Sequence, residues 1–199
     1  MARVKDQAAR RAEIVDAAKR AIAARGLTGL RLKDVAAECE LTAGAVAYYY
    51  PDLTQLVREV HLDEVDRFYW DRRRAIEAVD DPRVKLSRTV ASGVPSSARD
   101  VDFQVLNELH VHAYRDEVHA RLMADLFDRE VSLYESVLMD GVAAGVFALK
   151  APAGMIARNL VALEDAYGLH VLGGSRVGGA EVRDMILAHA AVMVGCDLG

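Results

Sequence analysis

Long hydrophobic runs are absent from this chain of 199 residues. No stretch without Asp, Glu, Lys or Arg reaches the roughly 18 residues that a membrane-spanning helix requires, and the apolar stretch 141–149 is half that length. The N-terminus lacks the apolar core of an export signal. The two cysteines, Cys39 and Cys196, are far apart and form no CxxC pair, so neither a disulfide framework nor a cysteine zinc site is supported. We therefore expect a cytoplasmic protein in a reducing compartment, with no membrane partner.

Proline and aromatic residues are also scarce, with 4 prolines and 6% aromatic residues. Because alanine, leucine, arginine and glutamate are common instead, this composition favours helices over strands. Apolar residues recur at helical spacing, and no segment shows the alternation expected of a strand. The sequence therefore predicts an all-α fold of about nine helices: three short ones within the first fifty residues, and six longer ones at about 52–79, 82–92, 100–114, 117–144, 152–174 and 179–196.

Residues with strong terminal preferences mark several helix ends. Gly26 follows the first apolar pattern, which begins at Ile14, and is expected just beyond the end of that helix. Thr42 and Asp52 are the expected N-caps of the third and fourth helices. Pro82 suits the first position of the next helix.

Charge is distributed unevenly along the chain. Residues 1–50 hold nine Lys/Arg against six Asp/Glu, a net charge of +3, and the remainder holds 16 against 24, a net charge of −8. A basic head on an acidic body suggests that only the head contacts a polyanion, although a split of this size also arises by chance.

Two short helices joined by a tight turn and preceded by a basic helix form a helix-turn-helix, in which the second short helix enters the DNA major groove. Residues 35–51, VAAECELTAGAVAYYYP, resemble the DNA-binding segment of TetR-type (tetracycline-repressor-like) transcriptional regulators. The shared features are the aliphatic residue followed by Ala, the Ser/Thr before the third helix, the Gly two residues later and the aromatic end before Pro51. The resemblance covers about the first quarter of the chain strongly, and residues 140–145 and 162–165 more faintly.

The resemblance implies an N-terminal three-helix DNA-binding domain at residues 1–51 and a helical ligand-binding and dimerisation domain at 52–199. At the head of the third helix, Thr42 can place its hydroxyl and the free backbone amides on a phosphate, and Gly44 lets the backbone approach DNA closely. The expected DNA-binding residues are Arg31, Lys33, Thr42, Ala43, Gly44, Ala45, Tyr48 and Tyr49. The alternative is that the segment forms only a small core with a solvated surface.

Four residues depart from the pattern of the family. Glu40 replaces the usual turn glycine, Ala47 replaces a tyrosine that contacts phosphate, and Leu53 replaces a lysine at the head of the fourth helix, next to the negative Asp52. Losing a tyrosine and a lysine removes contacts with the DNA backbone. A flexible basic arm with Arg3, Lys5, Arg10 and Arg11 is expected to compensate by reaching phosphates or the minor groove.

Three of the later predicted helices carry apolar side chains and a few polar groups on one face, which is typical of a small-molecule pocket. The resemblance also implies such a pocket, because members of the family release DNA when a ligand enters this domain. The expected ligand-binding residues are Phe103, Asn107, His110, Tyr114, Phe127, Tyr134, Asn159, Leu163, Tyr167 and His170. The ordinary alternative is a helical core whose polar residues are satisfied.

The sequence predicts no catalytic residue, no metal site and no cofactor. Glu59/His61, Glu108/His110 and Glu117/His119 are each two positions apart, about 200° around a helix. The two side chains of such a pair point in different directions and cannot bind the same ion. His61/Glu64 is the only histidine–glutamate pair at a spacing of three, and a di-iron bundle needs two such pairs and further carboxylates. No GxSxG, P-loop, GxGxxG or HExxH motif is present.

The last two predicted helices carry glycines and apolar residues that suit close packing, among them Gly168, Val182 and Ile186. In the resembled family these helices form the homodimer interface that lets two heads read two half-sites. Packing within a monomer is the alternative.

We therefore predict a homodimeric DNA-binding transcriptional regulator, a repressor that leaves a palindromic double-stranded DNA operator when a small, mostly apolar effector binds. Two alternatives differ from it in class: a TetR-like ligand-binding protein with weakened or lost DNA binding, and a helical enzyme or metalloprotein.

Overall fold

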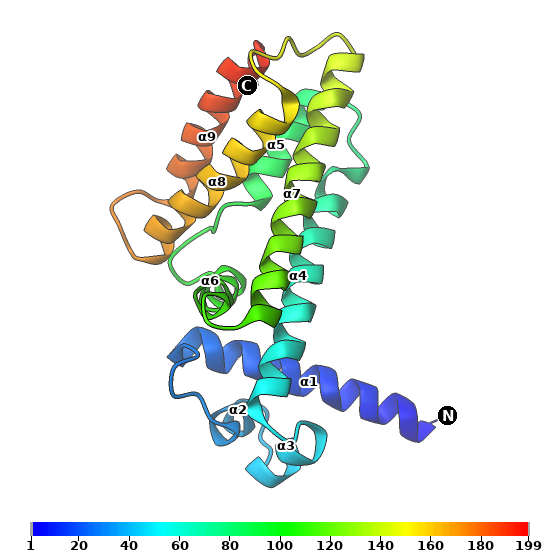
Figure 1. The fold of residues 1–199 in the computed structure, drawn as a ribbon, viewed down its shortest axis with the longest axis vertical. Helices are drawn as coiled ribbons and strands as arrows, with labels where there is room; N and C mark the ends of the chain where they lie inside the picture. The colour runs from blue at the N-terminus through cyan, green and yellow to red at the C-terminus, as the bar shows by residue number, and fades with distance from the viewer. Residues whose placement is uncertain (1, 199) are drawn as a thin grey trace. The chain divides into compact units, whose positions relative to one another are not determined.

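The structure, a computed structural model, describes residues 2–198, with side chains from residue 7 onward. Within this range it contains nine α-helices and no strand, which confirms the predicted all-α fold (Figure 1). The helices are α1 Ala2–Arg25, α2 Leu32–Glu38, α3 Ala43–Tyr49, α4 Leu53–Glu77, α5 Pro82–Ser92, α6 Val101–Ala113, α7 Glu117–Ala143, α8 Ala153–Leu172 and α9 Gly179–Val194. None of these described helices combines the length and apolar character that crossing a membrane requires.

The predicted helix ends are confirmed at four positions. Thr42 precedes α3 and its Oγ1 accepts a hydrogen bond of 3.1 Å from the Ala45 amide, and Asp52 Oδ1 accepts one of 2.8 Å from the Gln55 amide at the start of α4. Pro82 is the first residue of α5. Gly26 follows α1 with a φ of 73°, a conformation that side chains with a Cβ disfavour.

The prediction of a short first helix with a flexible arm before it is wrong. Helix α1 has 24 residues, and Arg3, Lys5, Arg10 and Arg11 all belong to it. The apolar pattern that begins at Ile14 marks only the part of the helix that packs on a core, since Ile14 is fully buried whereas residues 7–9 are exposed. The sequence before Ile14 carries no apolar stripe, so hydrophobic periodicity does not predict this part of the helix.

The chain divides into two compact units. Unit 1 comprises Met1–Asp66 and Val101–Met123, and unit 2 comprises Arg67–Asp100 and Ala124–Gly199. Helices α4 and α7 each contribute residues to both units. By contacts, the first part of α4 and all of α6 group with α1–α3; the functional boundary between residues 51 and 52 stays a prediction.

In unit 1, helix α1 packs against α2 on one side and α6 on the other (Figure 1). Its buried face consists mainly of alanines and aliphatic residues, and small side chains allow neighbouring helices to pack closely. The core of the unit includes Ile14, Ala18, Ile22, Val35, Val46, Tyr50, Leu56, Val60, Val105 and Leu109.

In unit 2, α9 packs against both α8 and α5. The core contains one fully buried aromatic residue, Tyr134, among aliphatic side chains from five helices. Members of this core include Ile76, Leu86, Val90, Val131, Leu138, Ile156, Leu160, Val182, Ile186 and Val194.

Candidate functional site

The helix-turn-helix of unit 1 has a small buried core. Val35 and Ala36 of α2 and Val46 of α3 are buried, and Tyr50 directly after α3 is fully buried. In the turn between the helices, the Leu41 amide donates a 3.0 Å hydrogen bond to the Ala36 carbonyl. This core leaves the opposite face of α3 open to solvent.

The predicted DNA-binding residues lie on this open face or beside it. Arg31, Lys33, Thr42, Ala43 and Gly44 are exposed, and Tyr48 is 72% exposed. The other two, Ala45 and Tyr49, are half-buried. Since Thr42 Oγ1 accepts the Ala45 amide, its hydroxyl proton is left to donate to a phosphate.

Two arginines of α1 bind the C-terminal ends of α2 and α3. Arg11 donates to the Tyr49 carbonyl at 3.1 Å, and its guanidinium lies 4.3 Å from the centre of the Tyr50 ring. Arg20 donates to the Glu38 carbonyl at 2.8 Å. Cations at helix C-termini satisfy carbonyls that have no partner within the helix. The expectation that Arg11 belongs to a flexible arm is therefore wrong, because this side chain holds α3 in place.

Three of the residues that depart from the family pattern, Glu40, Asp52 and Leu53, have distinct local environments in unit 1. Glu40 adopts a φ of 55°, and among the described residues it is the only one other than glycine with a positive φ. Leu53 is half-buried and packs against the core of unit 1. Asp52 forms the N-cap of α4, so Asp52 and Leu53 fit the fold, whereas Glu40 holds a conformation that side chains with a Cβ disfavour.

A depression beside the start of α2 gathers three cations. It is lined by Arg25, Arg31 and Lys33, with Asp34 as its only acidic member, and by residues 28–30. The Asp34 carboxylate already accepts the Arg31 amide at 2.9 Å. A surface of this charge suits a phosphate of the DNA backbone. Arg25 is missing from the sequence prediction because it stands at the end of α1, eight residues before Lys33.

The predicted ligand-binding residues fall into both units. In unit 1, helix α6 carries the half-buried Phe103, Asn107 and His110. Tyr114, directly after α6, is exposed, and its ring centroid lies 6.1 Å from that of His110.

In unit 2, Phe127, Leu163 and Tyr167 are half-buried and pack against the core to which Tyr134 belongs. Asn159 and His170 are exposed. Their roles in ligand binding stay predictions.

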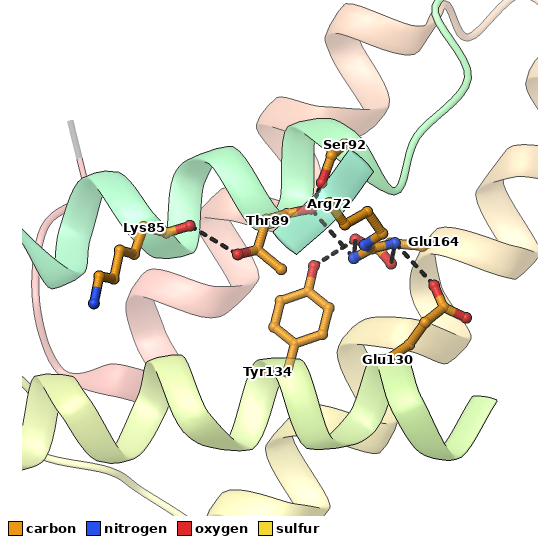
Figure 2. Close-up of polar contacts among 7 residues, drawn as sticks. All are labelled: Arg72, Lys85, Thr89, Ser92, Glu130, Tyr134 and Glu164. Atoms are coloured by element: carbon orange, nitrogen blue, oxygen red, sulfur yellow. Dashed lines mark hydrogen bonds and ion pairs between the residues drawn. The ribbon is translucent and has the colours of Figure 1, made fainter. Parts of the chain in front are cut away.

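The polar centre of unit 2 surrounds the guanidinium of Arg72 (Figure 2). Arg72, on α4, is 1% exposed and donates to both carboxylate oxygens of Glu164 on α8, at 3.0 and 3.1 Å. It also donates to Glu130 on α7 at 2.9 Å and to the Thr89 carbonyl on α5 at 3.2 Å. The hydroxyl of Tyr134 donates to Glu164. One arginine thus joins four helices, because a buried cation requires several acceptors.

Burial makes the charge of this centre depend on pH. It raises the pKa of Glu130 to about 8, even though the neighbouring Arg72 acts in the opposite direction. Burial also raises the pKa of Glu164, again against the attraction of Arg72. The centre therefore holds a proton on a carboxyl group near neutral pH. This proton offsets the net negative charge that two carboxylates and one guanidinium would otherwise have.

The sequence prediction missed this centre, although the sequence contains a signal for it. Arg72 lies seven residues after the buried Val65 and four before the buried Ile76, so it occupies the apolar stripe of α4. Glu130 and Glu164 interrupt the apolar stripes of α7 and α8 in the same way. Charged residues of both signs on apolar stripes of different helices indicate a buried ion pair.

Comparison with known proteins agrees with this architecture. Residues 14–60 match the family of bacterial regulatory proteins called the tetR family. The HTH-type transcriptional regulator BetI of Burkholderia cenocepacia is 36% identical over 85 residues, which cover 42% of this chain and 43% of the relative. The match to this relative therefore spans less than half of either protein.

Solved structures share the fold over nearly the whole chain. A TetR transcription regulator from Haloarcula marismortui superposes with a TM-score of 0.82 at 21% identity, over 96% of this chain and 99% of that one. A protein from Saccharomonospora viridis, described as a transcriptional regulator and solved in complex with choline, superposes with a TM-score of 0.84 at 23% identity, over 93% and 96% of the two chains. Residues 14–60 therefore match the tetR family, and the chain as a whole shares the fold of these solved structures.

Proposed function

We propose that this protein is a cytoplasmic transcriptional repressor that binds a palindromic operator and releases it when a small, mostly apolar ligand binds. The observation that carries the proposal is the open face of α3, where Thr42, Gly44 and Tyr48 are exposed over a buried helix-turn-helix core. A recognition helix needs this combination of a fixed backbone and free side chains.

Contacts with the DNA backbone would come from the cations around α2. Arg25, Arg31 and Lys33 line one depression and are positioned to neutralise phosphates. Each such contact releases counterions, so binding should weaken as the salt concentration rises. The lysine and tyrosine that this chain lacks at positions 53 and 47 make these cations more important.

The dimer interface is proposed on the outer faces of α8 and α9. Met155 and Leu169 of α8 are 54% and 56% exposed, and Met185 and Val192 of α9 are 39% and 68% exposed. Apolar side chains at this density favour contact with a second copy of the chain, and the head of a helix-turn-helix protein needs such a partner to read two half-sites. Ile186 is unsuitable for testing the interface, because it is 1% exposed and belongs to the core of its own chain.

The ligand is proposed to contact the half-buried aromatic and apolar residues of the predicted set that lie in unit 2, namely Phe127, Leu163 and Tyr167. Choline, which the Saccharomonospora viridis protein binds, is the first compound to titrate. Its quaternary ammonium group is recognised by aromatic faces, and its hydroxyl needs one polar partner.

Selection of bound sequences from a random duplex pool tests DNA binding directly. We expect enrichment of a palindrome, and we expect Tyr48→Ala to weaken binding to it without unfolding the protein, since the side chain is largely exposed. Lys33→Ala should weaken binding to all duplexes alike and lower the slope of log affinity against log salt by about 1 per contact. Lys150→Ala, at an exposed lysine of unit 2, is the matched control. Absence of any enriched duplex at low salt would favour the alternative of a ligand-binding protein that has lost DNA binding.

Titrations with and without operator DNA test the effector. Linkage requires that the operator weaken ligand binding by the same factor by which the ligand weakens operator binding. Equal ligand affinity in both titrations would contradict release by the ligand, even for a compound that binds.

A further inference from the structure

Three histidines and an aspartate come together in unit 1, outside the proposed DNA-binding surface. His61 lies on α4, His112 near the end of α6, Asp116 in the following turn and His119 in the first turn of α7. One side-chain ligand atom from each of His112, Asp116 and His119 lies within 4.8 Å of the other two. The rings of His112 and His119 have centroids 4.7 Å apart. Imidazole nitrogens with one carboxylate oxygen are a typical ligand set for divalent transition metals.

The backbone fixes the position of Asp116. Its Oδ1 accepts the amides of Val118 at 2.9 Å and His119 at 3.2 Å, so the aspartate caps α7. These two hydrogen bonds hold the pKa of Asp116 below its usual range. Neither of them uses Oδ2, which can therefore act as a ligand on the same fixed side chain.

A chain of buried contacts assigns the proton of His119. The Nε2 of His61 lies 3.2 Å from the sulfur of Met123, which can only accept, so His61 carries its proton on Nε2. The Nδ1 of His61 is then an acceptor, and it lies 2.6 Å from Nδ1 of His119. His119 therefore donates from Nδ1 and keeps a lone pair on Nε2. A histidine that binds a metal through one nitrogen donates from the other in this way.

We propose that His112, Asp116 and His119 bind one divalent transition-metal ion, such as Zn²⁺ or Co²⁺, with His61 as the residue that positions His119. Three protein ligands leave the fourth position of a tetrahedral ion for water or a small anion. The site joins the end of α6 to the start of α7, and His61 connects it to α4.

The geometry requires only small movements to close around an ion. Ligand atoms about 2.0–2.1 Å from a tetrahedral ion are about 3.3 Å apart, so atoms within 4.8 Å of one another need to approach by roughly 1.5 Å or less. His119 is 2% exposed, His61 is fully buried, and Asp116 is held by its two backbone hydrogen bonds, whereas His112 is half-buried. The two buried rings and Asp116 thus form a fixed base onto which the side chain of His112 closes.

This site differs from the pairs that the sequence argument excluded. Residues 112, 116 and 119 are spaced by four and three positions, but a turn interrupts the helix between them, and His61 is more than fifty residues away. Only the packing of α4 beside the α6–α7 turn brings the four together.

Titration of the untagged full-length protein with Co²⁺, after removal of metals with a chelator, tests the proposal. We expect one ion per chain, with the ligand-field absorption of a four- or five-coordinate ion, and competition by Zn²⁺. Asp116→Asn keeps an N-cap side chain and removes the charge of the ligand, and His112→Ala changes a half-buried residue; each should weaken binding more than tenfold. His189→Ala, at an exposed histidine of α9, should leave binding unchanged. Circular dichroism establishes that each variant is folded.

The positioning role of His61 has its own readout. His61→Phe should weaken Co²⁺ binding by about 10- to 100-fold while the absorption spectrum of the bound ion keeps its shape, because the ligands are the same. His61→Gln, which retains an acceptor, should recover part of the loss. The proposal is overturned if the folded Asp116→Asn and His112→Ala variants bind Co²⁺ as tightly as the unaltered protein. It is also overturned if the unaltered protein develops no ligand-field absorption with Co²⁺.

Discussion

The proposed DNA-binding surface of unit 1 and the polar centre of unit 2 place their polar residues in opposite environments. In unit 1 the proposed DNA-binding residues are mostly exposed and come from one short stretch, residues 25–49. In unit 2 the polar centre around Arg72 is buried and is assembled from four helices. An exposed residue can change with little effect on folding, whereas a buried charge that loses its partner costs several kcal/mol. Substitutions in the two regions should therefore alter different properties, DNA affinity in unit 1 and stability in unit 2.

The largest effect is expected from Arg72→Met. Removing the guanidinium leaves Glu164 buried without its counter-charge, so the free energy of unfolding should fall by about 3–5 kcal/mol. Arg73→Met, at the exposed neighbouring arginine, should change it by about 0.5 kcal/mol or less. Denaturant unfolding of both variants measures the difference. Similar small losses in the two would show that Arg72 contributes no more than a surface residue.

Glu130→Gln should change how stability depends on pH. Because the folded carboxyl keeps its proton up to a pKa of about 8 while the unfolded one loses it at much lower pH, raising the pH destabilises the folded state until pH exceeds that value. The loss is up to about 1.4 kcal/mol per pH unit, and glutamine, which does not ionise, should remove it.

Measuring the free energy of unfolding between about pH 6 and about pH 8 tests whether stability falls as the pH rises. Glu77→Gln, at the exposed last residue of α4, is the control and should retain the pH dependence of the unaltered protein. If the Glu130→Gln profile runs parallel to the unaltered one, Glu130 is already ionised in the folded state over this range.

Val192→Asp should separate the dimer without unfolding unit 2. The residue is 68% exposed, so a charge there is hydrated in the monomer and is buried only in the proposed interface. We expect monomers in light scattering and at least about tenfold weaker operator binding, equivalent to about 1.4 kcal/mol. Val84→Asp, at a 40% exposed valine of α5, should remain dimeric. A dimeric Val192→Asp protein would place the interface elsewhere.

The smallest effect, and the one expected to stabilise, concerns the turn of the helix-turn-helix. Glu40→Gly relieves a positive φ of 55° and should raise the free energy of unfolding by about 0.5–1 kcal/mol. Glu38→Gly, two residues earlier within α2, should lower it by about 1 kcal/mol, because glycine weakens a helix. Thermal unfolding of the two variants should therefore shift in opposite directions.

Local features of the sequence were sufficient for several helix ends and for the helix-turn-helix motif. Thr42, Asp52 and Pro82 act on the backbone within three residues of themselves, so their capping roles follow from sequence alone. The extension of α1 before Ile14 does not follow from the sequence pattern, since the exposed residues 7–9 carry no apolar stripe.

The polar centre around Arg72 and the pair of His61 and His119 could not be predicted from local features, because their members are far apart in the sequence. Arg72 is the first of three successive arginines, and only its place on the apolar stripe of α4 distinguishes it from Arg73 and Arg74. Its position suggests burial but not the partner, because Glu130 and Glu164 lie 58 and 92 residues further along the chain. His61 and His119 are likewise 58 residues apart.

The sequence by itself determined the helices, most of their ends and the short motif that exposes α3, because these depend on contacts between residues close together in the chain. Tertiary structure decided which charges are buried, which acceptors surround Arg72 and which side chains meet at His119. Those choices depend on how helices from distant segments rotate and pack against one another, and a buried charge is tolerated only where that packing supplies its partners.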